Sequence, residues 1–179
     1  MTERIVHRMN YKIHKQYRLP YYNYASTGLY FVTICAHNRE CIFGNIEKGK
    51  MNLSLVGEIA EQCWNNIPSS SPYAAIDSFT VMPNHVHGII AIENDEENRE
   101  ILDMKFQPAK KSLSIVVRNF KAAVSIRARE QFPGIKIRQS RFYDRIIRDE
   151  RELNAIRKYI ENNIIRWEED KNSPNNLMM

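Results

Sequence analysis

Two histidines separated by one residue, His85 and His87, are the clearest candidates for chemistry in this sequence. The segment around them has the composition of a β-strand, in which alternate side chains project from the same face. Both imidazoles would then lie within reach of one cation, while Val86 would point to the opposite face. The pair alone is a weak signal, because structural and surface histidines are more common than metal ligands. Its position directly after the turn-forming Pro83-Asn84 favours the metal interpretation.

Two histidines need a third metal ligand, and a helical segment near the C-terminus offers Asn163. Asn163 follows Tyr159 by four residues, so the two side chains share one face of a helix. An amide oxygen beside two imidazoles suits Mg²⁺ or Mn²⁺, whereas Zn²⁺ more often takes a cysteine or a third histidine. Tyr159 would lie one helical turn from the metal, and a phenol with a pKa of about 10 needs such help to act as a nucleophile. The alternative is an ordinary tyrosine on the surface of a helix.

The segments that would position these residues include both strands and helices. β-Branched and aromatic residues predict strands over 29–36, 75–82, 85–92 and 142–147, and a short hairpin within 41–53. Apolar residues at helical spacing predict helices from Ser54 to before Pro68, over 112–132, and from Asp149 to about Trp167. The Pro83-Asn84 turn would join two of the strands into a central antiparallel hairpin. The pattern therefore predicts an α+β fold with a single sheet.

The sequence predicts one catalytic domain over 29–167, in which 93–111 is a linker or an excursion. A basic, tyrosine-rich arm (1–28) precedes it, and a frayed tail (168–179) follows it. The chain has 179 residues, of which 43% are hydrophobic and 26% charged, as is usual for a soluble globular protein. It contains neither a signal core nor an apolar run of roughly 20 residues that could span a membrane. We therefore expect a cytoplasmic protein without membrane association.

The three cysteines form no C-x-x-C pair, which favours buried free thiols over a disulfide framework. A zinc site built from two of them and a histidine stays open as an alternative.

The distribution of charge favours a polyanionic partner. The net charge is +5, and an acidic stretch at 93–103 is followed by a basic one at 105–158. Basic side chains follow phosphates, and the tyrosines near the N-terminus offer faces on which unpaired bases stack. The candidates for contacts with the DNA backbone are Arg118, Lys121, Arg141, Arg145 and Arg148. Each could equally be a solvated surface charge.

Three blocks carry a resemblance to a known family: 29–39 (LYFVTICAHNR), 81–90 (VMPNHVHGII) and 141–167. They resemble the REP-associated tyrosine transposases of the single-tyrosine HUH superfamily, which is related to small insertion-sequence transposases. The resemblance implies a ferredoxin-like antiparallel sheet with helices packed on one face and the histidines on a central strand. It also implies that His85 and His87 bind metal, that Tyr159 is the nucleophile, and that Asn163 occupies a ligand position held in the family by glutamine or asparagine.

This chain departs from the family pattern at Arg138, where tryptophan is frequent, at Arg145, where histidine is frequent, and at Ile164, where proline is frequent. These departures affect substrate details rather than the expected ligands. Tyr143 is a rival nucleophile, although no ligand lies at helical spacing from it.

The function expected from residues and resemblance together is a transposase. It would be a metal-dependent endonuclease and strand transferase for single-stranded or hairpin DNA, acting in DNA transposition and recombination through a covalent 5′-phosphotyrosine. The alternatives are a catalytically inactive DNA-binding regulator with the same fold and a metal-dependent hydrolase that forms no covalent intermediate. The sequence is compatible with a homodimer.

Overall fold

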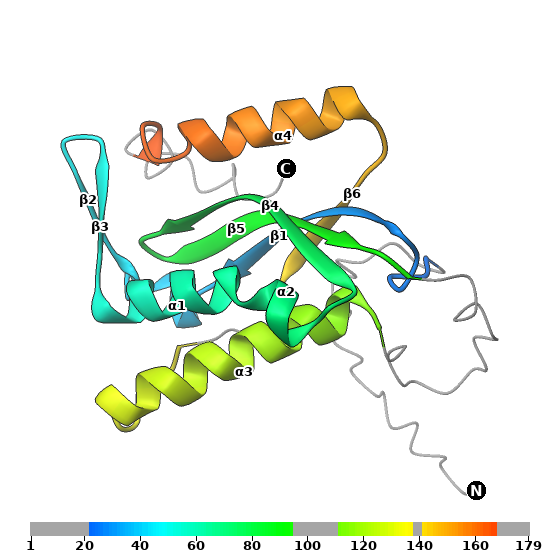
Figure 1. Ribbon diagram of the computed structural model, residues 1–179. Helices are drawn as coiled ribbons and strands as arrows, with labels where there is room; N and C mark the ends of the chain where they lie inside the picture. The colour runs from blue at the N-terminus through cyan, green and yellow to red at the C-terminus, as the bar shows by residue number, and fades with distance from the viewer. Residues whose placement is uncertain (1–21, 95–110, 138–140, 168–179) are drawn as a thin grey trace, which may run out of the picture.

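A computed structural model of the chain describes residues 22–94, 111–137 and 141–167 (Figure 1). In chain order its elements are β1 (Gly28–Cys35), the short 3-10 helix η1 (His37–Arg39), β2 (Gly44–Glu47), β3 (Lys50–Leu53), α1 (Leu55–Asn65), α2 (Ile67–Ser70), β4 (Ala74–Met82), β5 (His85–Ile92), α3 (Leu113–Gln131), β6 (Tyr143–Ile147) and α4 (Glu150–Asn162). The four long strands agree with the predicted ones to within one residue at each end. Most of the predicted arm, most of the excursion and all of the tail lie outside the described residues.

Four of the strands form one antiparallel sheet in the order β4-β5-β1-β6. With α1 between β1 and β4, and α3 between β5 and β6, the chain follows the β-α-β-β-α-β order of a ferredoxin-like fold. The strand that carries the histidines, β5, lies inside the sheet between β1 and β4. The predicted α+β class and the central position of the histidine strand are confirmed. β2 and β3 form a separate hairpin beside the sheet.

The two faces of the sheet are covered differently. One face packs against α1 and α3 and contains the larger core, including Tyr30, Val86 and Trp64. The other face packs against α4 through a smaller cluster centred on Phe31 and Ile89. The prediction of helices on one face is therefore right for α1 and α3 and wrong for α4. The physical reason is that β1 and β5 are apolar on both faces, so the second face of the sheet is also buried by a helix.

Two of the helices begin at the polar side chains that the sequence predicts as caps. Ser54 Oγ accepts a hydrogen bond from Gly57 N at the start of α1. Asp149 Oδ1 accepts one from Glu152 N at the start of α4. None of the helices in the described segments combines the length and the apolar character needed to cross a bilayer.

A glycine directly after the histidine pair lets α1 pack closely on β5. The Trp64 ring stacks on Phe79 with centroids 5.5 Å apart. A Cβ atom at Gly88 would lie 2.7 Å from Trp64 Cζ2 and 2.5 Å from Phe79 Cβ. Only glycine fits here without displacing a neighbour.

Candidate active site

His85 and His87 project from the same face of β5, the face that α4 covers. Their ring centroids lie 4.9 Å apart, and the two residues are only 2% and 1% exposed. Val86 points to the opposite face, into the core shared with α1 and α3. The geometry is the one expected from the alternation of side chains along a strand.

A hydrogen bond to the preceding turn orients the His85 ring. His85 Nδ1 lies 2.7 Å from Asn84 Oδ1. Because an amide oxygen can only accept, the ring donates from Nδ1 and carries its lone pair on Nε2. Fixing the tautomer in this way is a common support for a metal-binding histidine. The sequence reasoning used Asn84 only as a turn residue and missed this role.

Three residues at four-residue intervals, Tyr159, Asn163 and Trp167, lie above the histidine pair. The Tyr159 ring lies 5.5 Å from His87, and the Trp167 ring lies 6.3 Å from His85, measured between centroids. Asn163 lies one helical turn after Tyr159 and one turn before Trp167, so it shares their face of the helix. It is 2% exposed. The C-terminal end of α4 and the turn after it therefore bring Tyr159 and Asn163 to the histidines. Trp167, which closes the His85 side, was not among the predicted site residues.

Each of the three predicted ligands has a buried polar atom that lacks a hydrogen-bond partner. These atoms are His85 Nε2, His87 Nε2 and Asn163 Oδ1. A buried polar atom without a partner costs about 1–3 kcal/mol, a cost that a cation bound by these atoms would offset. Two imidazole nitrogens and one amide oxygen fit a divalent cation such as Mg²⁺ or Mn²⁺. In the described residues, no three His, Cys, Asp or Glu side chains gather as a metal site, so a cation held by the two histidines would need the Asn163 amide as its third ligand.

The protonation state of the histidines also suits metal binding. Burial, with a smaller contribution from the Arg39 guanidinium, lowers the pKa of His85 to about 4. Burial, followed by the neighbouring His85, holds the pKa of His87 well below its usual value. Both rings are therefore neutral at pH 7, the form that binds a metal.

Arg39 lies in a segment with unusual backbone geometry next to the site. Asn38 and Arg39 have φ values of 50° and 57°, in the left-handed region that non-glycine residues rarely adopt. The segment follows Cys35, which pairs directly with His85 across the sheet. A hydrogen bond of 2.8 Å from Ala36 N to Asn84 O holds its start against the histidine turn. Sequence reasoning did not single out Arg39, because a left-handed conformation leaves no clear signal at Asn-Arg.

The rival nucleophile, Tyr143, lies on the same face of the sheet as the histidines. It is paired with Thr33 on β1, and Thr33 is paired with His87 on β5. Tyr143 is thus two strands away from His87, about 10 Å at the usual strand spacing. Tyr159, in contrast, is in ring contact with His87 and is 37% exposed, so a substrate can reach it.

The predicted DNA contacts are scattered over the molecule. Lys121 is buried, donates from Nζ to Arg141 O at 2.7 Å and lies 5.4 Å from the centre of the Phe142 ring. It is therefore withdrawn as a DNA contact: its place beside the apolar stripe of α3 buries it. Arg118 is exposed on α3, on the other side of the sheet from the histidines.

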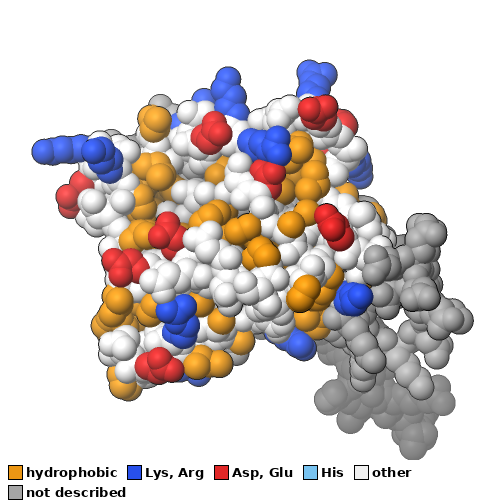
Figure 2. All heavy atoms as spheres, viewed as in Figure 1, with side chains coloured by type: hydrophobic (Ala, Val, Ile, Leu, Met, Phe, Trp, Pro, Cys, Tyr) orange, Lys and Arg blue, Asp and Glu red, His pale blue; other side chains and the backbone are white. Residues whose placement is uncertain are grey.

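Among the other candidates, Arg145 lies on the same face of the sheet as Phe31 and the histidines. It forms an ion pair with Glu152, 2.6 Å between Nε and Oε1, but its side chain is 58% exposed. Arg141 and Arg148 are exposed on either side of β6. Figure 2 shows basic and acidic side chains intermingled on the face of the molecule that it presents, around and below α4.

Comparison with known proteins finds a similar sequence but no matching family model. An uncharacterized protein of Haemophilus influenzae is 42% identical over 161 residues, which cover 86% of this chain and 89% of the relative. The chain belongs to the family of that protein.

A solved structure has the same fold as the described domain. It is that of a REP-associated tyrosine transposase bound to a REP hairpin, with a TM-score of 0.57 and 17% sequence identity. The match covers 86% of this chain and 74% of the other. At this identity the likeness shows the fold, which agrees with the resemblance found in the sequence blocks.

Proposed function

We propose that this protein is a metal-dependent endonuclease and strand transferase for single-stranded DNA, with Tyr159 as its nucleophile. The observation that supports it is the contact between the exposed Tyr159 ring and His87, one of two neutral, buried histidines. Tyr159 lies one helical turn before Asn163, whose buried oxygen lacks a hydrogen-bond partner, as do the Nε2 atoms of His85 and His87. A tyrosine with only a packing role would leave these three buried polar atoms unexplained.

His85, His87 and Asn163 would hold Mg²⁺ or Mn²⁺, which when bound polarises the scissile phosphate and offsets its charge. The chain itself supplies the nucleophile and its orientation. An edge contact with Phe31, at 6.0 Å between ring centroids, and a tilted contact with His87 at 5.5 Å confine the Tyr159 ring. This confinement limits the entropy lost when the phenol and the phosphate meet.

The reaction exchanges one ester for another. The Tyr159 phenol gives its proton to solvent, and its oxygen forms a bond to phosphorus while the bond from phosphorus to the 3′ oxygen breaks. The leaving 3′ oxygen takes up a proton, and the 5′ phosphate stays on the tyrosine. Because the ester is conserved, the 3′-hydroxyl of another strand can reverse the step and rejoin DNA.

The substrate we propose is single-stranded or hairpin DNA. Its support is the shared fold with a transposase bound to a REP hairpin, together with the exposed Arg145 on the site's face of the sheet. Arg118, Arg141 and Arg148 stay candidates for backbone contacts farther away. A homodimer and a cytoplasmic location stay predictions of the sequence.

Incubation with an end-labelled hairpin oligonucleotide and Mn²⁺ tests the proposal. We expect an SDS-resistant protein–DNA adduct that is absent in Tyr159→Phe and present in Tyr143→Phe. Cleavage without an adduct would support the hydrolase, and binding without cleavage would support the inactive regulator. An adduct that survives Tyr159→Phe and is lost in Tyr143→Phe would overturn the choice of nucleophile.

A further inference from the structure

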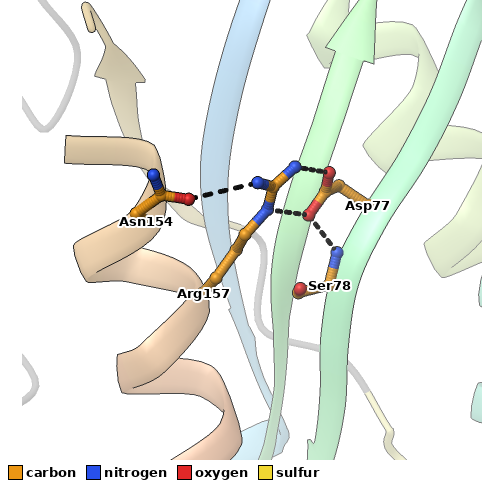
Figure 3. A network of polar contacts seen from close by, with 4 residues as sticks. All are labelled: Asp77, Ser78, Asn154 and Arg157. Atoms are coloured by element: carbon orange, nitrogen blue, oxygen red, sulfur yellow. Dashed lines mark hydrogen bonds and ion pairs between the residues drawn. The ribbon is translucent and has the colours of Figure 1, made fainter. Parts of the chain in front are cut away.

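A bidentate ion pair connects α4 to the edge strand β4, two residues before Tyr159. Arg157 Nη2 lies 2.6 Å from Asp77 Oδ2, and Arg157 Nε lies 2.9 Å from Asp77 Oδ1 (Figure 3). Arg157 also donates from Nη1 to Asn154 Oδ1 on the preceding turn of the helix, at 3.3 Å. Both partners of the pair are thus held at fixed angles.

Asp77 lies at a bulge in β4 and faces α4. Ile76 pairs with Ile90 and Phe79 pairs with Gly88, so β4 has one more residue than β5 over this interval. Ile76 packs against the larger core, so strand alternation directs Asp77 to the opposite face, toward α4. The extra residue then returns Phe79 to the face of Trp64. The backbone N–H of Ser78 donates to Asp77 Oδ1 at 2.6 Å and fixes the carboxylate on the bulge.

The charge of Asp77 is strongly stabilised by these contacts. The hydrogen bonds from Arg157, followed by the Ser78 backbone N–H, lower the pKa of Asp77 to about 2 against the opposing effect of burial. The two side chains are nevertheless 39% and 27% exposed. An exposed pair adds little to global stability, about 0–1 kcal/mol. The value of two parallel N–H···O bonds is geometric, because they fix orientation as well as distance.

The apolar contacts of α4 alone are weak at setting its rotation. Ile160 is the one residue of the 13 in α4 that is buried. It packs with the half-buried Leu153 and Ile156 against the cluster of Phe31 and Ile89. Apolar burial is non-directional, so the helix could roll about its axis at small cost. Successive residues of a helix differ by about 100°, and a roll by a fraction of that angle would carry Tyr159 off His87.

We propose that the Arg157–Asp77 ion pair sets the rotation of α4 and so holds the Tyr159 ring against His87. The proposal deepens the proposed function, on which its catalytic consequence rests. Arg157 and Asp77 are positioning residues: neither is in contact with the histidines, and they act through the helix that carries Tyr159.

Single-turnover kinetics with saturating labelled hairpin oligonucleotide and Mn²⁺ tests the catalytic consequence. Asp77→Asn keeps the shape of the side chain and removes the charge. We expect it to slow adduct formation about 10- to 100-fold, as for a misplacement of about 1 Å. The dissociation constants of oligonucleotide and Mn²⁺ should change by less than about twofold, since no contact with either is removed. The charge-exchanged double variant Asp77→Arg/Arg157→Asp should recover part of the rate.

Glu152→Gln is the matched control, since it breaks a different ion pair of α4, that with Arg145 at the first turn. We expect its adduct rate to stay at the wild-type level. An equal loss of rate in Glu152→Gln and Asp77→Asn would overturn the proposal, because it would indicate general weakening of the helix. A wild-type rate in Asp77→Asn would overturn it as well.

A second measurement separates this proposal from the proposed function. In protein labelled with 3-fluorotyrosine, the ¹⁹F signal of Tyr159 is assigned by its absence in Tyr159→Phe. Without metal or DNA, we expect this signal to move toward the free amino acid in Asp77→Asn and to stay in place in Glu152→Gln. If the wild-type protein forms no adduct, the proposed function fails, and the ¹⁹F shift still decides the positioning. An unmoved signal in Asp77→Asn refutes the positioning.

Discussion

Replacing Asn163 by leucine should separate the stability of the metal-free protein from its response to metal. Asn163 Oδ1 is buried without a hydrogen-bond partner, and leucine has the same branching at Cγ with no polar atom. An unpartnered buried acceptor costs about 1–3 kcal/mol. For a chain of this length each kcal/mol corresponds to about 2–4 °C in Tm. Asn163→Leu should therefore melt up to roughly 12 °C higher than wild type in EDTA, less the strain of fitting a larger side chain.

The advantage of Asn163→Leu over wild type should shrink when metal is added. At a free Mn²⁺ concentration of 100 times Kd, wild type gains about 2.7 kcal/mol. A tenfold weaker site at the same concentration gains only about 1.4 kcal/mol, and a hundredfold weaker site about 0.4 kcal/mol. The metal-induced rise in Tm should thus shrink to half or less in Asn163→Leu.

Thermal unfolding followed by circular dichroism, with and without Mn²⁺, gives both quantities. Asn163→Asp provides the opposite pattern: a buried carboxylate should lower Tm in EDTA, and its charge should enlarge the gain from metal. If Asn163→Leu keeps the full metal-induced rise, Asn163 is not a ligand. If Asn163→Leu instead melts lower than wild type in EDTA, the unpartnered Asn163 oxygen does not destabilise the metal-free protein as we infer.

Three further predictions concern packing, capping and pH. Gly88→Ala should lose about 1–3 kcal/mol of unfolding free energy by overpacking, measured in urea, whereas Gly28→Ala, whose added Cβ meets nothing closer than 3.6 Å, should lose none. Asp149→Ala removes the cap of α4 and should lower Tm by about 2–4 °C, for a cost of about 1 kcal/mol; an unchanged Tm would show that the cap is dispensable. Metal-free protein should lose stability as the pH falls from about 6.5 toward 4. Burial lowers the pKa of His85 and His87 in the folded state, so over this range the histidines of the unfolded chain bind protons and those of the folded chain do not. A His85→Phe variant should show a shallower decline over that range, and an equally steep one would contradict this reasoning.

The sequence predicted the sheet strands well because their residues are unambiguous. β-Branched and aromatic runs bounded by turn residues placed β1, β4 and β5, and strand alternation placed His85 and His87 on one face. The four-residue spacing of Tyr159 and Asn163 placed both on the helical face that meets the histidines. These are periodic signals, and periodicity is local to a single element.

What the sequence did not provide depends on contacts between elements. The position of α4 on the second face follows from the apolar surfaces of β1 and β5, which could equally have been covered by another element. Lys121 reads as a surface charge, yet its neighbours on α3 bury it. The pairing of Asp77 with Arg157 joins residues 80 positions apart in the sequence, which no local pattern encodes.

The order of the elements along the chain also sets the order in which the site can be assembled. The histidines belong to a strand in the middle of the chain, whereas Tyr159 and Asn163 belong to α4 and the turn after it, which follow every strand of the sheet. Domains tend to fold as the chain is synthesised, from the N-terminus onward. A ribosome that has released the chain only as far as β6 therefore presents the sheet and its histidines without the tyrosine. The DNA cutting that we propose would therefore require the complete chain.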